Sequence, residues 1–231
     1  MSAFAGFPPD VWAFLTELQA DNSKAFFDAN RQRYDDGIAG PSKALVETLA
    51  VMLPDRLGLD VRAEPTVGRS LFRINRDTRF AADKTPYKTH LDFLFWVGDG
   101  PPRARPAFIV RITANSVLVG GGRMAVTGGA LDAYRAALDD PNRSDAVRTA
   151  VDKLLAGGAE LSDPDRSRPP QPFPLDHPNA DLLRRDGFHL TRTTPHSTPL
   201  ASAAFAGWCG EALAPFVPIV AWFDAVDAVD A

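Results

Sequence analysis

One stretch of the chain concentrates side chains that bind anions. Residues 69–90 carry six basic and two acidic side chains, a net charge of +4 over 22 positions, whereas the remaining 209 residues sum to −8. Arginine offers a planar pair of donors to phosphate or carboxylate, and lysine adds a mobile point charge. We therefore predict that this segment binds a small anionic ligand. The residues expected to hold it are Arg73, Arg76, Arg79, Lys84 and Lys88.

Three further side chains of this segment are candidates for proton transfer with such a ligand. They are Asp77, Tyr87 and His90. Histidine titrates near neutral pH, tyrosine carries a hydroxyl, and a carboxylate accepts a proton. If residues 89–97 form a strand, His90 shares a face with Asp92, because side chains alternate along a strand. Arg111 on a following strand would line the same face with Arg73, so we count Arg111 among the ligand-binding residues.

The same charges also fit an internal ion-pair network. Arg76, Arg79 and Lys84 lie within a few residues of Asp77 and Asp83, so these side chains would tie a long loop to the sheet. Exposed ion pairs of this kind contribute little to stability. In this alternative the protein is non-catalytic and structural, or binds a partner through its acidic end. The chain after Arg192 contains aspartates but no lysine or arginine.

A nucleic-acid-binding module is the remaining alternative. Phe80 and Tyr87 would stack on bases while the basic residues contact phosphates. The formal net charge of the chain is −4, and no broad basic stripe accompanies the segment. These two features argue against nucleic acid as the partner.

The spacing of apolar residues along the chain changes from that of helices to that of strands and back again. Apolar residues recur at helical spacing in residues 10–20 and 41–53, and again in 131–138 and 147–155. A second helix is expected after Asn22 or Ser23, with a break at Gly37 and Gly40. Alternation predicts strands at 71–75, 89–97, 108–112, 117–119 and 188–193. Residues 162–178 contain six prolines and are expected to form a loop. An apolar helix is expected to close the chain at 200–223, with an interruption near Pro215 and Pro218.

Because hairpins and short loops join these strands, the pattern predicts an α+β fold. We expect a mostly antiparallel sheet of about five strands, packed with N-terminal and C-terminal helices. The length of 231 residues suffices for a full core, and we expect a single domain over 1–231. The oligomeric state does not follow from the pattern.

Composition places the chain among ordinary soluble proteins, with 45% hydrophobic and 23% charged residues. The N-terminus lacks the basic region of a signal peptide, and no apolar run approaches the roughly 20 residues of a membrane helix. We therefore expect a cytoplasmic protein without a membrane partner.

Four further features suggest no second chemistry. The four histidines have no metal-ligand spacing, so no metal site is expected, and His177 fits a helix start better than catalysis. No dinucleotide or phosphate-loop motif names a cofactor. Cys209 fits a small core residue, and the glycine run 120–122 fits a strand-end bend better than an anion nest. The sequence leaves open whether the protein is an enzyme.

The segment RDTRFAADKTPYKTH, at 76–90, resembles the signature of the Domain of Unknown Function 2461 family of bacteria and fungi. The resemblance extends over nearly the whole chain. It includes Asn22, Phe27, Asn30 and Tyr34 near the N-terminus, and it continues through the glycine run, Tyr134-Arg135, Asp176-His177-Pro178 and Leu182-Leu183. It implies one-domain architecture and supports 73–90 as the site, but it supplies no reaction.

Overall fold

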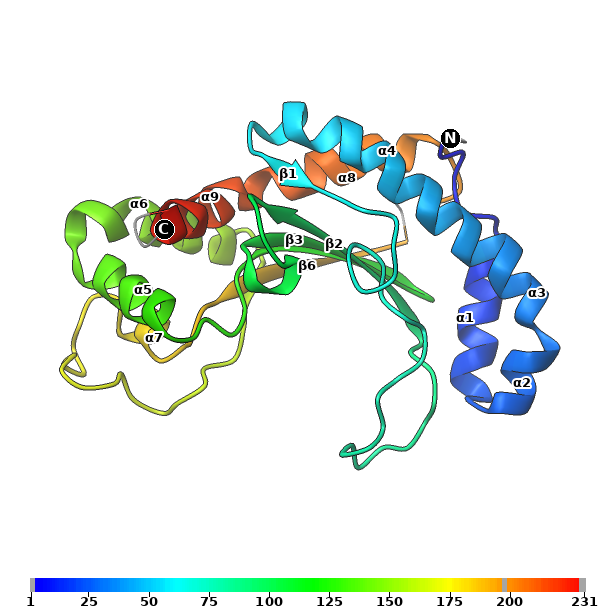
Figure 1. The fold of residues 1–231 in the computed structure, drawn as a ribbon, viewed down its shortest axis with the longest axis horizontal. Helices are drawn as coiled ribbons and strands as arrows, with labels where there is room; N and C mark the ends of the chain where they lie inside the picture. Colours follow the sequence, from blue (N-terminus) through cyan, green and yellow to red (C-terminus); the bar gives the residue numbers. More distant parts are fainter. Residues whose placement is uncertain (1–2, 197–198, 229–231) are drawn as a thin grey trace. The chain divides into compact units, whose positions relative to one another are not determined.

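The computed structural model describes residues 3–196 and 199–228. Within these ranges, six strands form one antiparallel sheet in the order β1-β2-β3-β4-β6-β5 (Figure 1). The α+β fold expected from the sequence is therefore confirmed. The strands are β1 (Val61–Arg62), β2 (His90–Val97), β3 (Ala107–Thr113), β4 (Ser116–Gly122), β5 (Glu160–Leu161) and β6 (His189–Pro195).

The chain divides into two compact units. The first comprises Met1–Phe95, Ile109–Leu118 and Thr193–Ala212. The second comprises Trp96–Phe108, Val119–Arg192 and Leu213–Ala231. Several strands contribute residues to each unit, and the expected single-domain organisation stays a prediction.

In the first unit, helices form as the apolar spacing predicts, with one exception. Ser23 caps α2 by accepting a hydrogen bond from the backbone N–H of Phe26. The expected break at Gly37 and Gly40 is wrong, because a π-helical turn, η1 (Asp35–Ala39), continues the helix. Glycine costs a helix about 1 kcal/mol, which weakens it without ending it. The α-helices are α1 (Asp10–Ala20), α2 (Lys24–Ala29), α3 (Arg31–Tyr34), α4 (Gly40–Leu57) and α8 (Ala204–Leu213).

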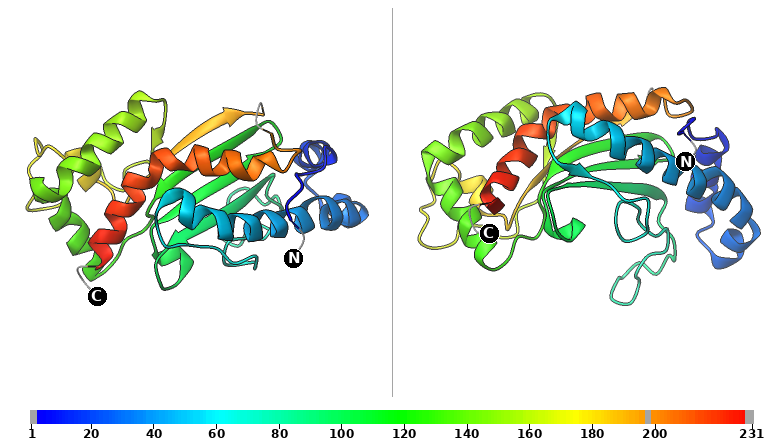
Figure 2. Two further views of the ribbon diagram at one scale, coloured as in Figure 1. Left: turned by 90° about the horizontal axis from the view of Figure 1, so that it is seen from above. Right: turned by 45° about the horizontal axis from the view of Figure 1, so that its top comes forward.

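Helices α4 and α8 lie side by side over one face of the sheet (Figure 2). Arg56 of α4 donates to Glu211 of α8 over 3.0 Å. The lack of a side chain at Gly210 lets Met52 and Arg56 approach closely. Apart from Ser42, the buried side chains of the two helices are apolar, and they include Leu45, Leu49, Leu53, Phe205 and Cys209. Cys209 is therefore the core residue that the sequence predicts, and burial raises the pKa of its thiol.

The expected strand at 71–75 does not form. This segment pairs only through isolated bridges, of Leu71 with Phe93 and of Asn75 with Tyr87. The two bridges are in different registers, because the partners Phe93 and Tyr87 are six residues apart whereas Leu71 and Asn75 are four apart, so no continuous ladder joins them. Pro86 has no N–H to donate, so the pairing also cannot continue past Asn75.

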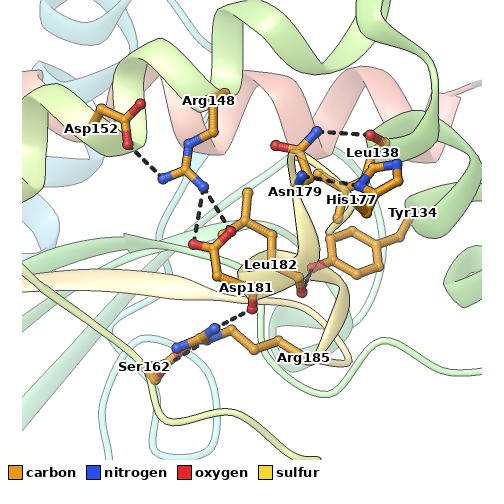
Figure 3. Close-up of polar contacts among 10 residues, drawn as sticks. All are labelled: Tyr134, Leu138, Arg148, Asp152, Ser162, His177, Asn179, Asp181, Leu182 and Arg185. Atoms are coloured by element: carbon orange, nitrogen blue, oxygen red, sulfur yellow. Dashed lines mark hydrogen bonds and ion pairs between the residues drawn. The ribbon is translucent and has the colours of Figure 1, made fainter. Parts of the chain in front are cut away.

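The second unit packs its helices around buried aromatic side chains. Tyr134 of α5 stacks on Phe223 of α9, with ring centroids 5.7 Å apart. The Tyr134 hydroxyl donates to the Leu182 carbonyl over 2.8 Å, and Asn179 donates to the Leu138 carbonyl over 2.9 Å (Figure 3). The α-helices are α5 (Gly129–Asp139), α6 (Pro141–Ala156), α7 (Ala180–Leu183) and α9 (Val217–Ala228), and short 3-10 turns span Pro102–Ala104 and Ala214–Phe216.

The proline-rich segment 162–178 is a loop, as expected, and it ends at α7. The ring of His177 accepts a hydrogen bond at Nδ1 from the Asn179 backbone N–H, over 3.0 Å. Its Nε2 lies 3.2 Å from an Asp139 carboxylate oxygen. His177 therefore has the helix-start role that the sequence predicts.

The glycine run at the end of β4 lies against β6. Gly122 has a φ of +147°, and a Cβ there would lie 2.3 Å from the Phe188 carbonyl oxygen. The backbone N–H of Arg123 donates to that same oxygen over 2.8 Å. Because this N–H is already used within the sheet, the strand-end bend is confirmed in preference to an anion nest.

Two aspartates near the C-terminus are paired within the second unit. Asp224 accepts from Arg105 over 2.7 Å, and Asp227 accepts from Arg123. They belong to α9, so the acidic end is not a free tail as far as Ala228. Asp230 lies outside the described residues.

The closing helix is longer than the sequence predicts. Pro215 and Pro218 stand in first-turn positions, where no backbone N–H is required, so the helical path runs from Ala204 to Ala228. By length and composition alone this stretch could cross a membrane, contrary to the expectation of no such run. In this structure 44% of its apolar window is buried. A core helix meets the same criterion, so the finding is weak evidence for a membrane span.

Candidate functional site

The tip of the cationic segment is an internal ion-pair network. Arg79 binds Asp77 through two contacts of 2.7 and 3.0 Å. Arg76 contacts both the Asp83 carboxylate and the Thr85 hydroxyl. The Thr85 backbone N–H and Arg76 lower the pKa of Asp83 to about 2.

The remaining charges of the tip are also satisfied locally. Lys84 donates to the Thr78 carbonyl over 2.9 Å. Arg79 lowers the pKa of Asp77, so this carboxylate is a weaker base than an ordinary aspartate. The ion-pair interpretation therefore describes the tip, from Asp77 to Lys84.

Two hollows adjoin the base of the segment, both within the first unit. An enclosed cavity of about 70 Å³ is lined by residues that include Tyr34, Ser42, Lys43, Arg73, Lys88 and His90. An open groove of about 580 Å³ is lined by residues that include Asn22, Arg76, Asp77, Tyr87, Lys88 and His90. Lys88 and His90, which lie next to and at the start of β2, line both hollows.

Basic side chains dominate the charged lining of the cavity. Lys43, on α4, and Arg73 are exposed and make no hydrogen bond or close ion pair among the described residues, but the charge of Arg73 lowers the pKa of nearby Asp77. The ammonium of Lys88 lies 4.8 Å from the centre of the Phe72 ring and 3.5 Å from a carboxylate oxygen of Asp92. Asp92 is the only carboxylate among the lining residues that the structure describes.

Asp92 is buried, with 7% of its surface exposed, and it is surrounded by donors. Arg111 on β3 contacts it through Nε at 2.6 Å and Nη2 at 3.3 Å. His90 Nε2 lies 3.3 Å from its Oδ2. Burial by itself would raise the pKa of Asp92. The hydrogen bonds from His90 and Arg111 together lower this pKa by more than burial raises it, so the net shift is downward. The carboxylate is therefore ionised at neutral pH.

Tyr87 has a packing role at the groove. Its ring stacks on Phe27 with centroids 4.4 Å apart and planes 17° from parallel. Asn22 donates to the Tyr87 carbonyl and accepts from the Tyr87 N–H, each over 3.0 Å. These contacts hold the segment against the loop between α1 and α2.

The structure brings together part of the predicted site. Arg73, Arg76, Lys88 and His90 line the hollows, and Arg111 reaches them through Asp92. Arg79 and Lys84 line neither hollow. The shared face of His90, Asp92 and Arg111, expected from strand alternation, is confirmed.

Sequence reasoning missed Lys43 and did not count Asp92 among the site residues. Lys43 follows Pro41 in an amphipathic helix, where a lysine is usually a solvated surface residue. Asp92 carried a signal, because alternation placed it beside His90. In the described ranges, no group of three or more histidine, cysteine or carboxylate side chains could hold a metal ion.

The sequence model of one family, described as "Conserved hypothetical protein (DUF2461)", matches residues 10–222. The chain belongs to this family. No curated protein matches the chain. The DUF2461 match includes both hollows and the Asp92 cluster, so the candidate site lies wholly within the family region.

Proposed function

We propose that this DUF2461 protein binds a small molecule through a phosphate or carboxylate group placed in the cavity beside Arg73. One observation supports the proposal: the exposed side chains of Lys43 and Arg73 line the cavity without a hydrogen bond or close ion pair among the described residues, although Arg73 is near enough to Asp77 to lower the pKa of that carboxyl. An anion there gains two charge-assisted interactions without breaking an existing ion pair.

The dimensions of the hollows agree with this assignment. The cavity of about 70 Å³ holds a group somewhat larger than two waters, each of which occupies about 30 Å³ in the liquid. The groove of about 580 Å³ is in the usual range of small-molecule sites. The charged group would occupy the cavity, and the body of the ligand would follow Lys88 and His90 into the groove.

The proposal predicts a selective loss of anion binding in Arg73→Gln. Removing one charged donor weakens binding of inorganic phosphate or succinate by roughly tenfold or more, the equivalent of about 1.5 kcal/mol or more. Isothermal titration calorimetry at low salt measures the affinity. Low salt is needed because exposed charges are screened.

Arg79→Gln is the matched control. It removes the same charge from the same segment, but Arg79 is held by Asp77 and lines neither hollow. The affinity of Arg79→Gln for inorganic phosphate or succinate should stay within twofold of the affinity of the wild type. Equal losses in both variants, or no binding of either anion by the wild type, would refute the proposal.

A single-stranded nucleic acid is the second candidate ligand, favoured by the exposure of one aromatic side chain. Phe80 is 96% exposed between Arg79 and Lys84 at the tip of the segment. Stacking of a base on an aromatic ring contributes about 1–3 kcal/mol. Phe80→Ala should then weaken oligonucleotide binding about fivefold or more in a fluorescence-anisotropy titration, and leave phosphate binding unchanged. An oligonucleotide that fails to bind at low salt eliminates this candidate.

A further inference from the structure

His90 is the side chain, among those that line both hollows, whose geometry suits proton transfer. It stands two residues before Asp92 on β2, so both side chains lie on one face of the strand. Its Nε2 is 3.3 Å from the Asp92 carboxylate, and no described residue hydrogen-bonds to its Nδ1. The ring also lines both the cavity and the groove.

Asp92 determines which nitrogen of His90 carries the hydrogen. An ionised carboxylate can only accept hydrogen bonds, so the Nε2 of a neutral His90 must be the protonated nitrogen. Arg111 and Lys88 face the same carboxylate and keep it charged. The lone pair of His90 is therefore on Nδ1, the nitrogen that remains for a ligand.

The other two candidates lack this geometry. Asp77 is bound by Arg79 at the exposed tip of the segment. Tyr87 is 6% exposed and its ring is covered by Phe27. Neither presents a free acceptor to both hollows.

We infer that His90 accepts a proton at Nδ1 from a hydroxyl group of an anionic ligand, and that Asp92 is its positioning residue. This inference rests on the proposed function, because the bound anion places the hydroxyl beside the ring. The proton moves to Nδ1, and the electrons of the O–H bond stay on the oxygen. Asp92 stabilises the resulting imidazolium, and the step reverses when Nδ1 returns the proton to the same oxygen. The ligand class is a small hydroxylated phosphate or carboxylate.

The tautomer of His90 tests the inference without a known substrate. Long-range proton–nitrogen NMR spectra of the full chain with isotope-labelled histidine report which ring nitrogen carries hydrogen, and His90→Gln assigns the signal. We expect neutral His90 with hydrogen on Nε2. Asp92→Asn should abolish this preference, because an amide can donate as well as accept. Addition of inorganic phosphate should shift the Nδ1 resonance of the wild type.

His177 is an internal reference for these spectra. Its Nδ1 accepts from a backbone N–H, so its neutral ring also carries hydrogen on Nε2, independently of Asp92. The wild-type spectrum decides the tautomer even if Asp92→Asn does not fold. Hydrogen on Nδ1 of neutral His90, or an unchanged tautomer in a folded Asp92→Asn, overturns the inference. Calorimetric phosphate binding without a shift at Nδ1 overturns it while leaving the proposed function standing, and absence of any anion binding overturns both.

Discussion

Gly122→Ala is expected to lower the free energy of unfolding by about 4 kcal/mol. The alanine Cβ would lie 2.3 Å from the Phe188 carbonyl oxygen and 2.6 Å from the His189 Cα, so it meets backbone atoms that no rotamer change can move. Overpacking costs about 1–3 kcal/mol, and a φ of +147° at a residue other than glycine costs a similar amount. Urea denaturation monitored by tryptophan fluorescence measures the loss.

Gly207→Ala is the control for this substitution. Gly207 lies inside α8, and a Cβ there meets nothing within 4 Å. Alanine is a better helix former by up to about 1 kcal/mol, so this variant should be more stable than the wild type. A Gly122→Ala protein within about 1 kcal/mol of the wild type would contradict the close approach of β4 and β6.

Asp92→Asn is expected to cost about 3 kcal/mol at neutral pH. The substitution keeps the shape of the side chain but removes the charge that pairs with Arg111 and Lys88. Breaking a fully buried ion pair by removing one partner costs about 3–5 kcal/mol, and we expect the low end here because Arg111 and Lys88 keep 37% and 23% of their side chains exposed, so that water compensates part of the remaining charge. Urea denaturation at a series of pH values measures it.

The difference between wild type and Asp92→Asn should depend on pH in one direction. Because folding lowers the pKa of Asp92, the ionised carboxylate stabilises the folded state fully at pH values above the pKa of the unfolded state, about 3.9. This stabilisation is lost as the pH falls through the lower folded value. The two unfolding free energies should therefore converge on acidification below about pH 4.

Glu211→Gln provides the comparison for a surface charge. Glu211 pairs with Arg56, and at least half of each side chain is exposed. Loss of an exposed pair should change stability by less than about 1 kcal/mol. A pH-independent difference for Asp92→Asn, or one no larger than that of Glu211→Gln, would contradict the buried carboxylate cluster.

Sequence periodicity predicted the part of the site that lies on regular strands. Alternation along β2 set His90 and Asp92 on one face and Leu91, Phe93 and Phe95 on the other, and β3 placed Arg111 beside the first pair. This inference worked because a two-residue period fixes the face of every side chain once the register is known. The clustered charges also marked the segment that borders both hollows.

The same reasoning could not separate the ligand-facing charges from the paired ones. Arg73 and Arg79 look alike in the sequence, but Arg79 hydrogen-bonds to Asp77, whereas Arg73 lines the cavity and acts on Asp77 only through its charge. In a segment without regular secondary structure, no sequence period shows which way each side chain points. For the same reason, alternation in 71–75 suggested a strand, but the change of register between its two bridges prevents a continuous ladder, and the two-residue strands β1 and β5 were too short to be recognised.

The contact of Asn22 with Tyr87 joins parts of the chain that are 65 positions apart. The side-chain amide exchanges the same two hydrogen bonds with the main chain that a neighbouring strand would exchange. A single asparagine thus imitates one rung of a β-ladder where Pro86 ends the real one. The shape of the groove therefore depends on the loop between the first two helices. A shortened form that begins after residue 22 would lose the contact of Asn22 with Tyr87, even though it retains every charged residue of the site.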